Sequence, residues 1–251
     1  MPKPLAVNPK LAFLRKIFAK ARPALLRGMG TLGRVQVNPS AAAAEVAKLE
    51  HDLGEIIHGA LTAAGLPFAM APAHGTPLPF PTGWLYTPLF GRRNAEHALG
   101  WCGAAIAFLQ DGRVAAAGIL TPDMEDPCLI AAGEGATCGD RLRASGRTLA
   151  DAILLMTTVS ADSARLKLLQ HAEKVPFHTR KTGAPLMDAL LVARGHADVM
   201  VATRLSDFEL LLADFLMKES AATAKTLPDD TFVGGNTKIV GELTALLAKG
   251  A

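Results

Sequence analysis

Hydrophobic positions near the start of the chain recur at the spacing of an α-helix. One face of this predicted first helix carries Leu11, Leu14, Ile17, Phe18 and Leu25. A second helix is predicted over residues 41–64, an alanine-rich segment that follows the Asn38-Pro39-Ser40 cap region and stops at Gly65-Leu66-Pro67. The chain therefore begins with two helices.

The pattern then changes from helix to sheet. Prolines are too frequent between residues 67 and 81 for regular structure, so a loop or a set of turns is predicted there. Two apolar runs joined by Gln110-Asp111-Gly112-Arg113 are typical of a β-hairpin with an Asp-Gly turn. Short strands are predicted at residues 84–86, 102–109, 114–120, 129–132 and 137–142. The first half is predicted to be helices followed by an antiparallel sheet.

After Ser145-Gly146-Arg147, predicted strands and helices alternate. The strands fall at residues 153–158, around Phe177, at 199–202 and at 222–226. The helices fall at residues 163–173, 185–194, 207–220 and 237–249. This alternation predicts a layered α/β second half. We therefore expect an α/β protein with an α+β N-terminal half, residues 1–147, and an α/β C-terminal half, residues 148–251.

Composition adds little to this picture. With 251 residues, of which 50% are hydrophobic, the chain can bury a substantial core as one domain or as two packed halves. Cys102, Cys128 and Cys138 form no CxxC pair, so they are interpreted as buried thiols. The start of the sequence lacks an apolar signal region, and no apolar run reaches the roughly 20 residues that cross a bilayer. A cytoplasmic location is expected.

A net charge of +3 is too small to indicate nucleic-acid binding, but the positive charge gathers in the first helix. The basic residues of this helical segment all precede the first acid, Glu45, and are Lys10, Arg15, Lys16, Lys20, Arg22, Arg27 and Arg34. Such a helix could lie on an anionic membrane surface or meet an acidic partner. Alternatively, its apolar face packs on the domain and its charges face water.

Several short strings stand in a characteristic order along the chain. The most specific is Thr87-Pro88-Leu89-Phe90-Gly91-Arg92, which follows a hydrophobic strand and precedes Asn94. The others are Ala131-Ala132-Gly133-Glu134-Gly135-Ala136, Arg143-Ala144-Ser145, Arg180-Lys181-Thr182-Gly183-Ala184, the segment 192–198, Phe208-Glu209 and Lys218-Glu219-Ser220. In this order they resemble the inositol monophosphatase family, magnesium-dependent sugar phosphatases with a layered αβαβα fold. The resemblance covers nearly the whole chain.

The departures from the family's pattern concern its acids. Where the family has Asp-Pro-Leu-Asp-Gly-Thr, Thr87 and Phe90 replace the two aspartates and Arg92 replaces the threonine. No acid occurs between Glu55 and Glu96, where the family has Gly-Glu-Glu. Glu209 keeps an acid at the family's Trp-Asp position, whereas Ala202 stands where a substrate-binding acid is expected.

Magnesium needs several hard oxygen ligands, and a pair of ions is needed to polarise a phosphoryl group and generate hydroxide. One carboxylate cannot hold such a cluster. We therefore expect no magnesium, no other cofactor and no catalytic residue in this chain.

The loss of three or more acids, together with the gain of Arg92 and Arg93, should make this position attract anions in place of cations. A helix N-terminus presents N–H groups to an anion, and a guanidinium pairs bidentately with phosphate or carboxylate. By resemblance, the expected ligand-binding residues are Gly91, Arg92, Arg93, Asn94, Gly183, Ala184 and Glu209. In the alternative interpretation, Arg92 and Arg93 point into solvent and Glu209 is a first-turn acid favoured by the helix dipole.

No other motif competes with this one. The seven histidines form no H-x-x-x-H pair, and no serine lies in a G-x-S-x-G string. Gly133-Glu134-Gly135 and Gly234-Gly235-Asn236 are interpreted as turns, because neither stands in a phosphate-binding motif.

Three functional hypotheses remain. The first is a catalytically degenerate, inositol-monophosphatase-like protein with a binding, scaffolding or regulatory role that takes a small anionic or phosphorylated ligand. A homodimer is expected for it. The second is a weak phosphatase that uses remaining or relocated acids, such as Glu209, Asp207 and Glu96. The third is a module that binds a partner or a membrane surface through its basic first helix.

Overall fold

The computed structural model describes residues 8–157, 170 and 178–248. The chain forms two compact units, one of Met1–Ala71 with Pro79–Gly139 and one of Pro72–Leu78 with Asp140–Ala251. The sequence predicted a division at residue 147, which lies within the second unit. Hydrogen bonds explain this, because Ala144 N donates to Ser220 O at 3.0 Å and Asn236 Nδ2 donates to Ser145 O at 2.8 Å.

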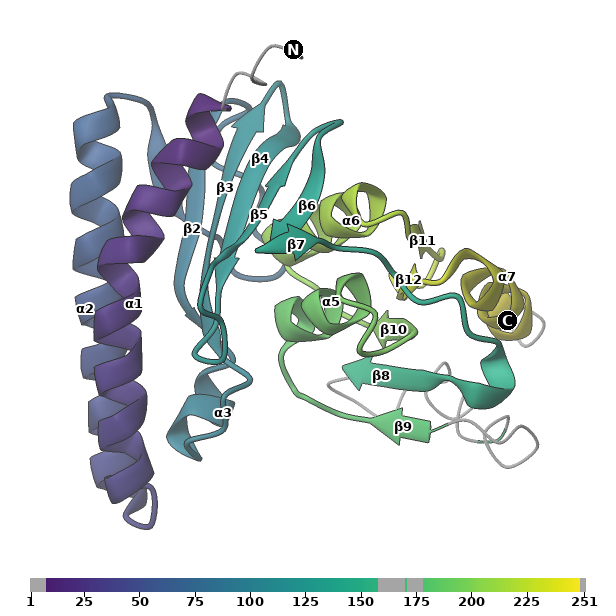
Figure 1. Ribbon diagram of the computed structural model, residues 1–251, viewed down its shortest axis with the longest axis horizontal. Helices are drawn as coiled ribbons and strands as arrows, with labels where there is room; N and C mark the ends of the chain where they lie inside the picture. The colour runs from purple at the N-terminus through teal and green to yellow at the C-terminus, as the bar shows by residue number, and fades with distance from the viewer. Residues whose placement is uncertain (1–7, 158–169, 171–177, 249–251) are drawn as a thin grey trace. The chain divides into compact units, whose positions relative to one another are not determined.

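Two long helices lie side by side along one face of the sheet in the first unit (Figure 1). α1 spans Pro9–Val35, and the side chain of its N-cap, Asn8, accepts a hydrogen bond from Lys10 N. α2 spans Pro39–Ala64, with Asn38 as N-cap and Gly65 as a left-handed C-cap, at a φ of 69°. Both predicted helices are confirmed. The apolar face of α1 is buried, including Leu14, Ile17, Phe18 and Leu25.

The sheet of the first unit follows the order of the chain. Its strands are β1 (Phe68–Met70), β2 (Gly83–Phe90), β3 (Gly103–Gln110), β4 (Arg113–Leu120), β5 (Cys128–Ala131) and β6 (Gly135–Cys138). β2 to β6 pair antiparallel, as predicted. A short strand, β7 (Asp140–Arg141), follows at the boundary of the units. The predicted turn between β3 and β4 is present, with Asp111 and Gly112 at φ values of 52° and 75°.

The prediction of a loop over residues 67–81 was wrong at its start. β1 pairs parallel with β2, with Phe68 opposite Trp84. Trp84 N donates to Pro67 O at 2.8 Å. Proline is tolerated at this position because it takes part in the hydrogen bonding between β1 and β2 through its carbonyl group, for which no N–H is needed. A strand of three residues at the sheet edge carries too little periodicity to be recognised among prolines.

The main core of the first unit lies between this sheet and the two helices. Trp84 of β2 is central, since its ring centroid lies 4.9 Å from that of Phe108 in β3 and 5.3 Å from that of Phe13 in α1. Tyr86 and Ile106 face the same cluster. Alternation along β2 directs Leu85 and Thr87 to the opposite face of the sheet.

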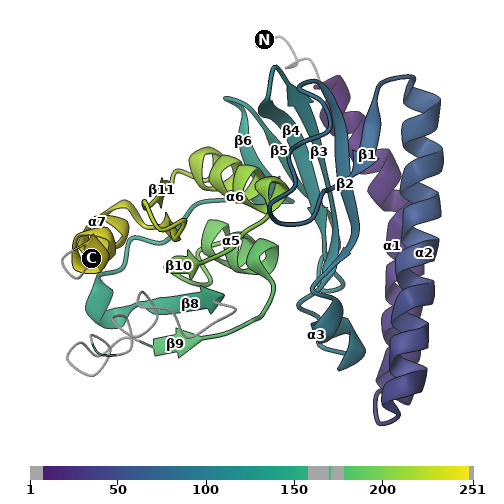
Figure 2. The ribbon, with the colours of Figure 1, turned by 180° about the vertical axis from the view of Figure 1, so that it is seen from behind.

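The second unit is a mixed sheet with helices on both faces, which Figure 2 shows from behind. Its strand order is β11-β12-β10-β8-β9, with β8 parallel to β9 and β10, and β12 antiparallel to its neighbours. The elements are η1 (Leu149–Asp151), β8 (Ile153–Thr157), β9 (His178–Arg180), α5 (Pro185–Ala193), β10 (Val199–Ala202), α6 (Asp207–Glu219), β11 (Thr223–Thr226), β12 (Phe232–Gly235) and α7 (Thr237–Ala248). The predicted helix over 163–173 lies outside the described residues.

One central strand was misread as a turn. Gly234 and Gly235 belong to β12, which lies between β10 and β11. Glycine is needed at 235 because an added Cβ would lie 2.4 Å from Asp198 O of the adjacent chain segment, at a φ of 153°. The sequence interpretation took the glycine pair for a turn. In the structure the pair permits close approach of two backbone segments.

Candidate functional site

The end of β2 carries two residues at positions where the family resemblance leads us to expect aspartates. Thr87 and Phe90 lie in the same strand, and the pairing of β2 with β3 shifts register between them. The Phe90 side chain is buried and sits opposite Gly103, whose added Cβ would meet the Phe90 ring at 3.2 Å and Leu120 O at 2.0 Å. Glycine is required at 103 first by the Leu120 carbonyl, and the missing side chain also leaves space beside the Phe90 ring. The position where the resemblance leads us to expect a metal-binding carboxylate is therefore apolar and buried.

Arg92 and Arg93 open α3 (Arg92–Glu96), a helix of five residues. Arg92 forms an ion pair with Glu50 of α2, and its Nε lies 3.9 Å from a carboxylate oxygen of Glu96. Arg93 Nη1 lies 3.2 Å from the other oxygen of Glu96, although 83% of its side chain is exposed. Two acids thus offset the two arginines, which the sequence interpretation did not anticipate.

Gly91 and Asn94 hold the backbone around these arginines. Gly91 has a φ of 68°, and an added Cβ would lie 2.3 Å from Trp101 O. Asn94 is buried, and its Nδ2 donates to the same carbonyl at 2.8 Å. Both residues therefore have a structural function in joining α3 to the 97–102 loop, and a ligand role for them stays a prediction.

Gly183 and Ala184 form the entry to α5 in the second unit. Gly183 adopts a φ of 73°, and Ala184 is the buried N-cap, without a side-chain cap bond. Ala184 N donates to Thr182 Oγ1 at 3.1 Å. The N–H groups of the next turn lack a side-chain cap and are the polar groups that this region can offer to a ligand.

A buried acid lies beneath this turn and was missed by the sequence interpretation. Asp188 is fully buried, and its two carboxylate oxygens accept hydrogen bonds from Thr157 and Thr182. Burial raises the pKa of Asp188 to about 6, although both hydroxyl hydrogen bonds act to lower it. Its sequence signal is a single acid within the apolar run of α5, from Pro185 to Ala193.

Thr157 ends β8, and Thr203 follows β10, so both mark the carboxyl ends of adjacent parallel strands. Thr203 N donates to Thr157 O at 3.1 Å. The Thr203 hydroxyl is buried and has no hydrogen-bond partner among the described residues. Carboxyl ends of parallel strands are common positions for ligand sites, so this polar edge is a candidate in its own right.

Glu209 lies in the first turn of α6, as predicted for a dipole-favoured acid. It forms a capping box with Ser206, whose backbone N and Oγ donate to Glu209 Oε2 at 3.0 and 2.9 Å. His74, from the segment where the family has two glutamates, lies in the same unit and donates through Nδ1 to Leu205 O at 2.8 Å. His74 therefore places an imidazole beside the start of α6, in the segment where the resemblance leads us to expect two glutamates.

These donors do not fit magnesium. Thr87 offers one neutral hydroxyl and Phe90 offers none, whereas magnesium requires near-octahedral oxygen coordination. Among the described residues, no group of three or more His, Cys, Asp or Glu side chains could hold a metal ion. The expectation of no bound magnesium therefore stays a prediction, supported by the chemistry of the donors.

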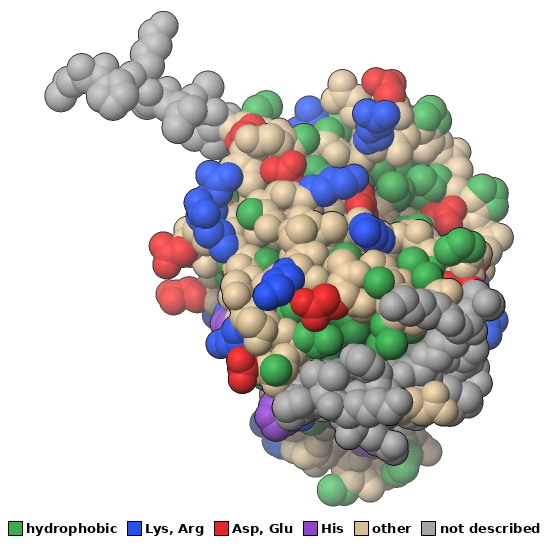
Figure 3. Space-filling view, turned by 90° about the vertical axis from the view of Figure 1, so that its right-hand side faces the viewer, with side chains coloured by type: hydrophobic (Ala, Val, Ile, Leu, Met, Phe, Trp, Pro, Cys, Tyr) green, Lys and Arg blue, Asp and Glu red, His purple; other side chains and the backbone are tan. Residues whose placement is uncertain are grey.

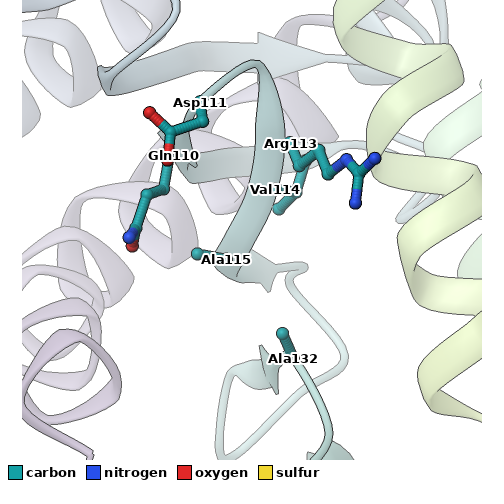
Figure 4. A pocket seen from close by; sticks show the side chains of 6 residues that line it. All are labelled: Gln110, Asp111, Arg113, Val114, Ala115 and Ala132. Carbon is teal, nitrogen blue, oxygen red and sulfur yellow. The ribbon is translucent and has the colours of Figure 1, made fainter.

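A separate hollow of about 480 Å³ lies at the β3–β4 turn and is shown in Figure 4. Its lining residues are Gln110, Asp111, Arg113, Val114, Ala115 and Ala132. In this view the Arg113 side chain points away from Gln110 and Asp111, so the polar groups do not converge. None of the predicted site residues lines it.

Two observations bear on larger partners. On the face shown in Figure 3, basic and acidic side chains of the described residues are interspersed, without one dominant basic patch. No helix in the described part of the chain is both long and apolar enough to cross a membrane.

Comparison with known proteins gives two relatives and many solved structures of the same fold. The chain is 27% identical over 223 residues to inositol-1-monophosphatase of Caulobacter vibrioides, covering 84% of this chain and 86% of that protein. It is 26% identical over 170 residues to Nus factor SuhB of Pseudomonas aeruginosa, covering 62% of this chain and 63% of the relative. No family model matches.

The structural likeness extends over the whole chain. Inositol monophosphatase II of Staphylococcus aureus superimposes with a TM-score of 0.77 at 15% identity, covering 97% of this chain and 95% of that one. The suppressor protein suhB of Bartonella henselae gives 0.75 at 18% identity, covering 95% and 99%. At these sequence identities the structural similarity establishes a layered α/β fold. It does not establish an activity.

Proposed function

Because the chain belongs to the inositol monophosphatase family, we propose that it is a binding protein that takes a small phosphorylated ligand without metal and without hydrolysis. The observation that carries this proposal is Phe90. Its buried ring, accommodated by Gly103, stands where the family motif has a metal-binding aspartate. In this proposal the replacement removes a carboxylate and also fills its position with a buried ring.

Loss of metal chemistry follows from the donors that remain. A two-metal phosphatase uses its ions to stabilise both the attacking and the leaving oxygen. In the first unit, the motif retains the Thr87 hydroxyl, which is a poor substitute for a carboxylate. In the second unit, the Glu209 carboxylate accepts two hydrogen bonds from Ser206 within its own helix cap. Among the described residues, no group of three or more acidic, histidine or cysteine side chains offers the ligands that such hydrolysis requires.

Ligand binding is proposed at Arg92 and Arg93. Ion pairs between exposed side chains contribute about 0–1 kcal/mol each, so a phosphate dianion can compete with Glu50 and Glu96 for these guanidiniums. Arg92 is half-exposed, at 46%, and its partner Glu50 lies on a different element. A bidentate phosphate contact would replace the contact between Arg92 Nη1 and a single carboxylate oxygen of Glu50.

The first test measures ligand binding in the absence of metal. We expect myo-inositol 1-phosphate at millimolar concentration, in EDTA, to raise the unfolding temperature of the full chain. Arg92→Ala should abolish this rise. The matched control is Arg113→Ala, which removes an exposed arginine from the β3–β4 turn of the same unit. Equal shifts in both variants, or no shift in the wild type, would count against binding at this position.

The second test concerns catalysis. We expect no phosphate release from inositol 1-phosphate above background with either magnesium or manganese. Magnesium-dependent release that disappears in Glu209→Gln would overturn the proposal and establish the second hypothesis, a weak phosphatase. That hypothesis is favoured by the name of the Caulobacter relative, inositol-1-monophosphatase.

The other relative supports a role outside catalysis, since it is named as a Nus factor and not as a phosphatase. We include a homodimer in the proposal, as the family resemblance implies. Light scattering of the purified chain at micromolar concentration should give twice the 26.3 kDa mass of one chain. A monomer mass that persists at the highest concentration tested would remove the dimer from the proposal.

A further inference from the structure

Two cysteines occupy opposite positions in the β5–β6 hairpin. The register pairs Leu129 with Thr137, Ile130 with Ala136 and Ala131 with Gly135. One step further, Cys128, the first residue of β5, stands opposite Cys138, the last residue of β6. Both belong to the first unit.

This placement satisfies the geometry of a disulfide. Residues directly opposite in antiparallel strands direct their side chains to the same face, with Cα atoms about 4.5–5.5 Å apart. A disulfide requires a Cα separation of roughly 4.4–6.8 Å. Residues at opposite positions therefore fall within the Cα separation that a disulfide requires.

The two side chains differ in access to solvent. Cys128 is buried, whereas Cys138 is partly exposed, and both are thiols in the structure. Cys138 Sγ lies 3.4 Å from Asp126 O, in the segment that leads into β5. The third cysteine is different, because burial, reinforced by the charge of Asp123, raises the pKa of Cys102 to about 12. A thiol with that pKa supplies little of the thiolate that attacks an oxidant.

We propose that Cys128 and Cys138 are a redox-active pair that forms a disulfide across the hairpin when the protein meets a small-molecule disulfide. The accessible Cys138 thiolate attacks one sulfur of the oxidant, and one thiolate of the oxidant leaves. Cys128, after losing its proton to water, then attacks the Cys138 sulfur and expels the second thiolate. Two protein thiols are oxidised, one external disulfide is reduced to two thiols, and a dithiol reverses the process.

The proposed site is independent of the ligand-binding proposal, since neither cysteine is among the ligand residues. Its effect is local, because the bridge joins the open end of the hairpin, opposite the turn at residues 132–134. Oxidation would therefore fasten the end of the sheet at which the chain passes from the first unit to the second. This makes the hairpin a modification site that responds to thiol–disulfide balance.

The test uses the full chain and glutathione disulfide at pH 8. Thiols counted after denaturation should fall from three to one in the wild type, and from two to none in Cys102→Ser. In Cys138→Ser, both remaining thiols should persist, since Cys102 and Cys128 are buried away from the oxidant. Dithiothreitol should restore the original count in each oxidised sample.

Peptide mapping identifies the bond without any variant. Trypsin leaves both cysteines in one peptide, residues 114–141, whose mass should fall by that of two hydrogen atoms. Cleavage after glutamate separates the cysteines at Glu134, so the oxidised sample should yield peptides 126–134 and one beginning at Gly135 joined by a reducible bond. Retention of all three thiols, a bond to Cys102, or glutathione that stays attached to Cys138 would each overturn the inference.

Discussion

At the scale of single residues, Asp188 shows how the fold changes the chemistry of one side chain. An acid within an apolar helix is placed where water cannot reach it, and two threonine hydroxyls supply its hydrogen bonds. Burial disfavours the charged form more than these hydrogen bonds favour it. The result is a carboxyl group that changes charge near neutral pH inside the second unit.

A dependence of stability on pH follows from this shift. The pKa of Asp188 is about 6 in the folded state, whereas the ordinary value for an aspartate is 3.8. Between pH 3.8 and about 6 the folded chain therefore binds more protons than the unfolded chain. Its contribution to the free energy of unfolding therefore falls as pH rises from about 4 to 6 and is constant above. The size is on the order of 3 kcal/mol.

Asp188→Asn should remove this dependence, because the amide stays neutral. Urea unfolding between pH 4.5 and 7.5 should show the variant gaining stability relative to the wild type as pH rises. Asp111→Asn, in the exposed β3–β4 turn, is the matched control. Curves of Asp188→Asn and wild type that stay parallel would contradict the assigned role of burial.

Gly91 permits a second prediction at this scale. Its φ of 68° and the 2.3 Å distance from an added Cβ to Trp101 O both oppose any side chain. Gly91→Ala should reduce the free energy of unfolding by roughly 3 kcal/mol or more, combining left-handed strain with a clash against backbone. Gly133→Ala shares the positive φ, at 75°, but meets no atom within 4 Å, so about 1 kcal/mol is expected. Equal losses would show that strain alone decides.

At the scale of elements, the packing of α1 on α2 depends on a single small residue. An added Cβ at Gly28 of α1 would lie 2.6 Å from Leu49 Cδ1 of α2, and Leu49 is buried. Glycine costs helical propensity here and permits close approach of the two helices. The pair covers the sheet as one layer for this reason.

Two substitutions in the same helix should therefore have opposite signs. Gly28→Ala should destabilise by about 1 kcal/mol or more, since overpacking exceeds the gain in helix propensity. Gly30→Ala, where an added Cβ meets no atom within 4 Å, should stabilise by up to about 1 kcal/mol. Chemical unfolding monitored by circular dichroism measures both. Stabilisation by both variants would mean that Leu49 relaxes freely.

At the scale of the whole molecule, the basic first helix is a structural element. The hydrophobic face that could have met a membrane contains Leu14, Ile17 and Phe18, all buried in the first unit. Some of its basic side chains have intramolecular contacts, as Arg22 Nε donates to Met124 O at 2.9 Å and Arg15 lies 3.5 Å from Asp126. These three apolar side chains are therefore not available for insertion into a membrane surface, as the hypothesis of a membrane-surface module requires.

We therefore expect the chain to remain in the supernatant when sedimented with vesicles containing phosphatidylserine at physiological ionic strength. A net charge of +3, screened by salt, gives weak attraction without apolar insertion. Cosedimentation that is lost in Lys16→Glu/Lys20→Glu, and kept in Lys225→Glu, would instead support the third hypothesis. Lys225 is an exposed lysine of β11 in the second unit.

The sequence predicted most elements because their signals are local. The two N-terminal helices, the Asp-Gly hairpin and β10 follow from periodicity, capping residues and turn chemistry. β1 and β12 were missed, since each is identified by pairing with a distant strand and not by its own composition. At the site, Thr87 and Phe90 were recognised as replacements, whereas Asp188 was overlooked within an apolar helix.

The sequence by itself determined the family resemblance, the order of elements and the replacement of the motif's aspartates, because these depend on residue identity and local spacing. The tertiary structure decided which residues these side chains contact. It placed the Phe90 ring over Gly103, paired Arg92 with Glu50 forty-two positions away in the chain, and enclosed Asp188 with Thr157 and Thr182. These contacts join residues distant in sequence, and burial and charge pairing are set only when the chain has folded around them.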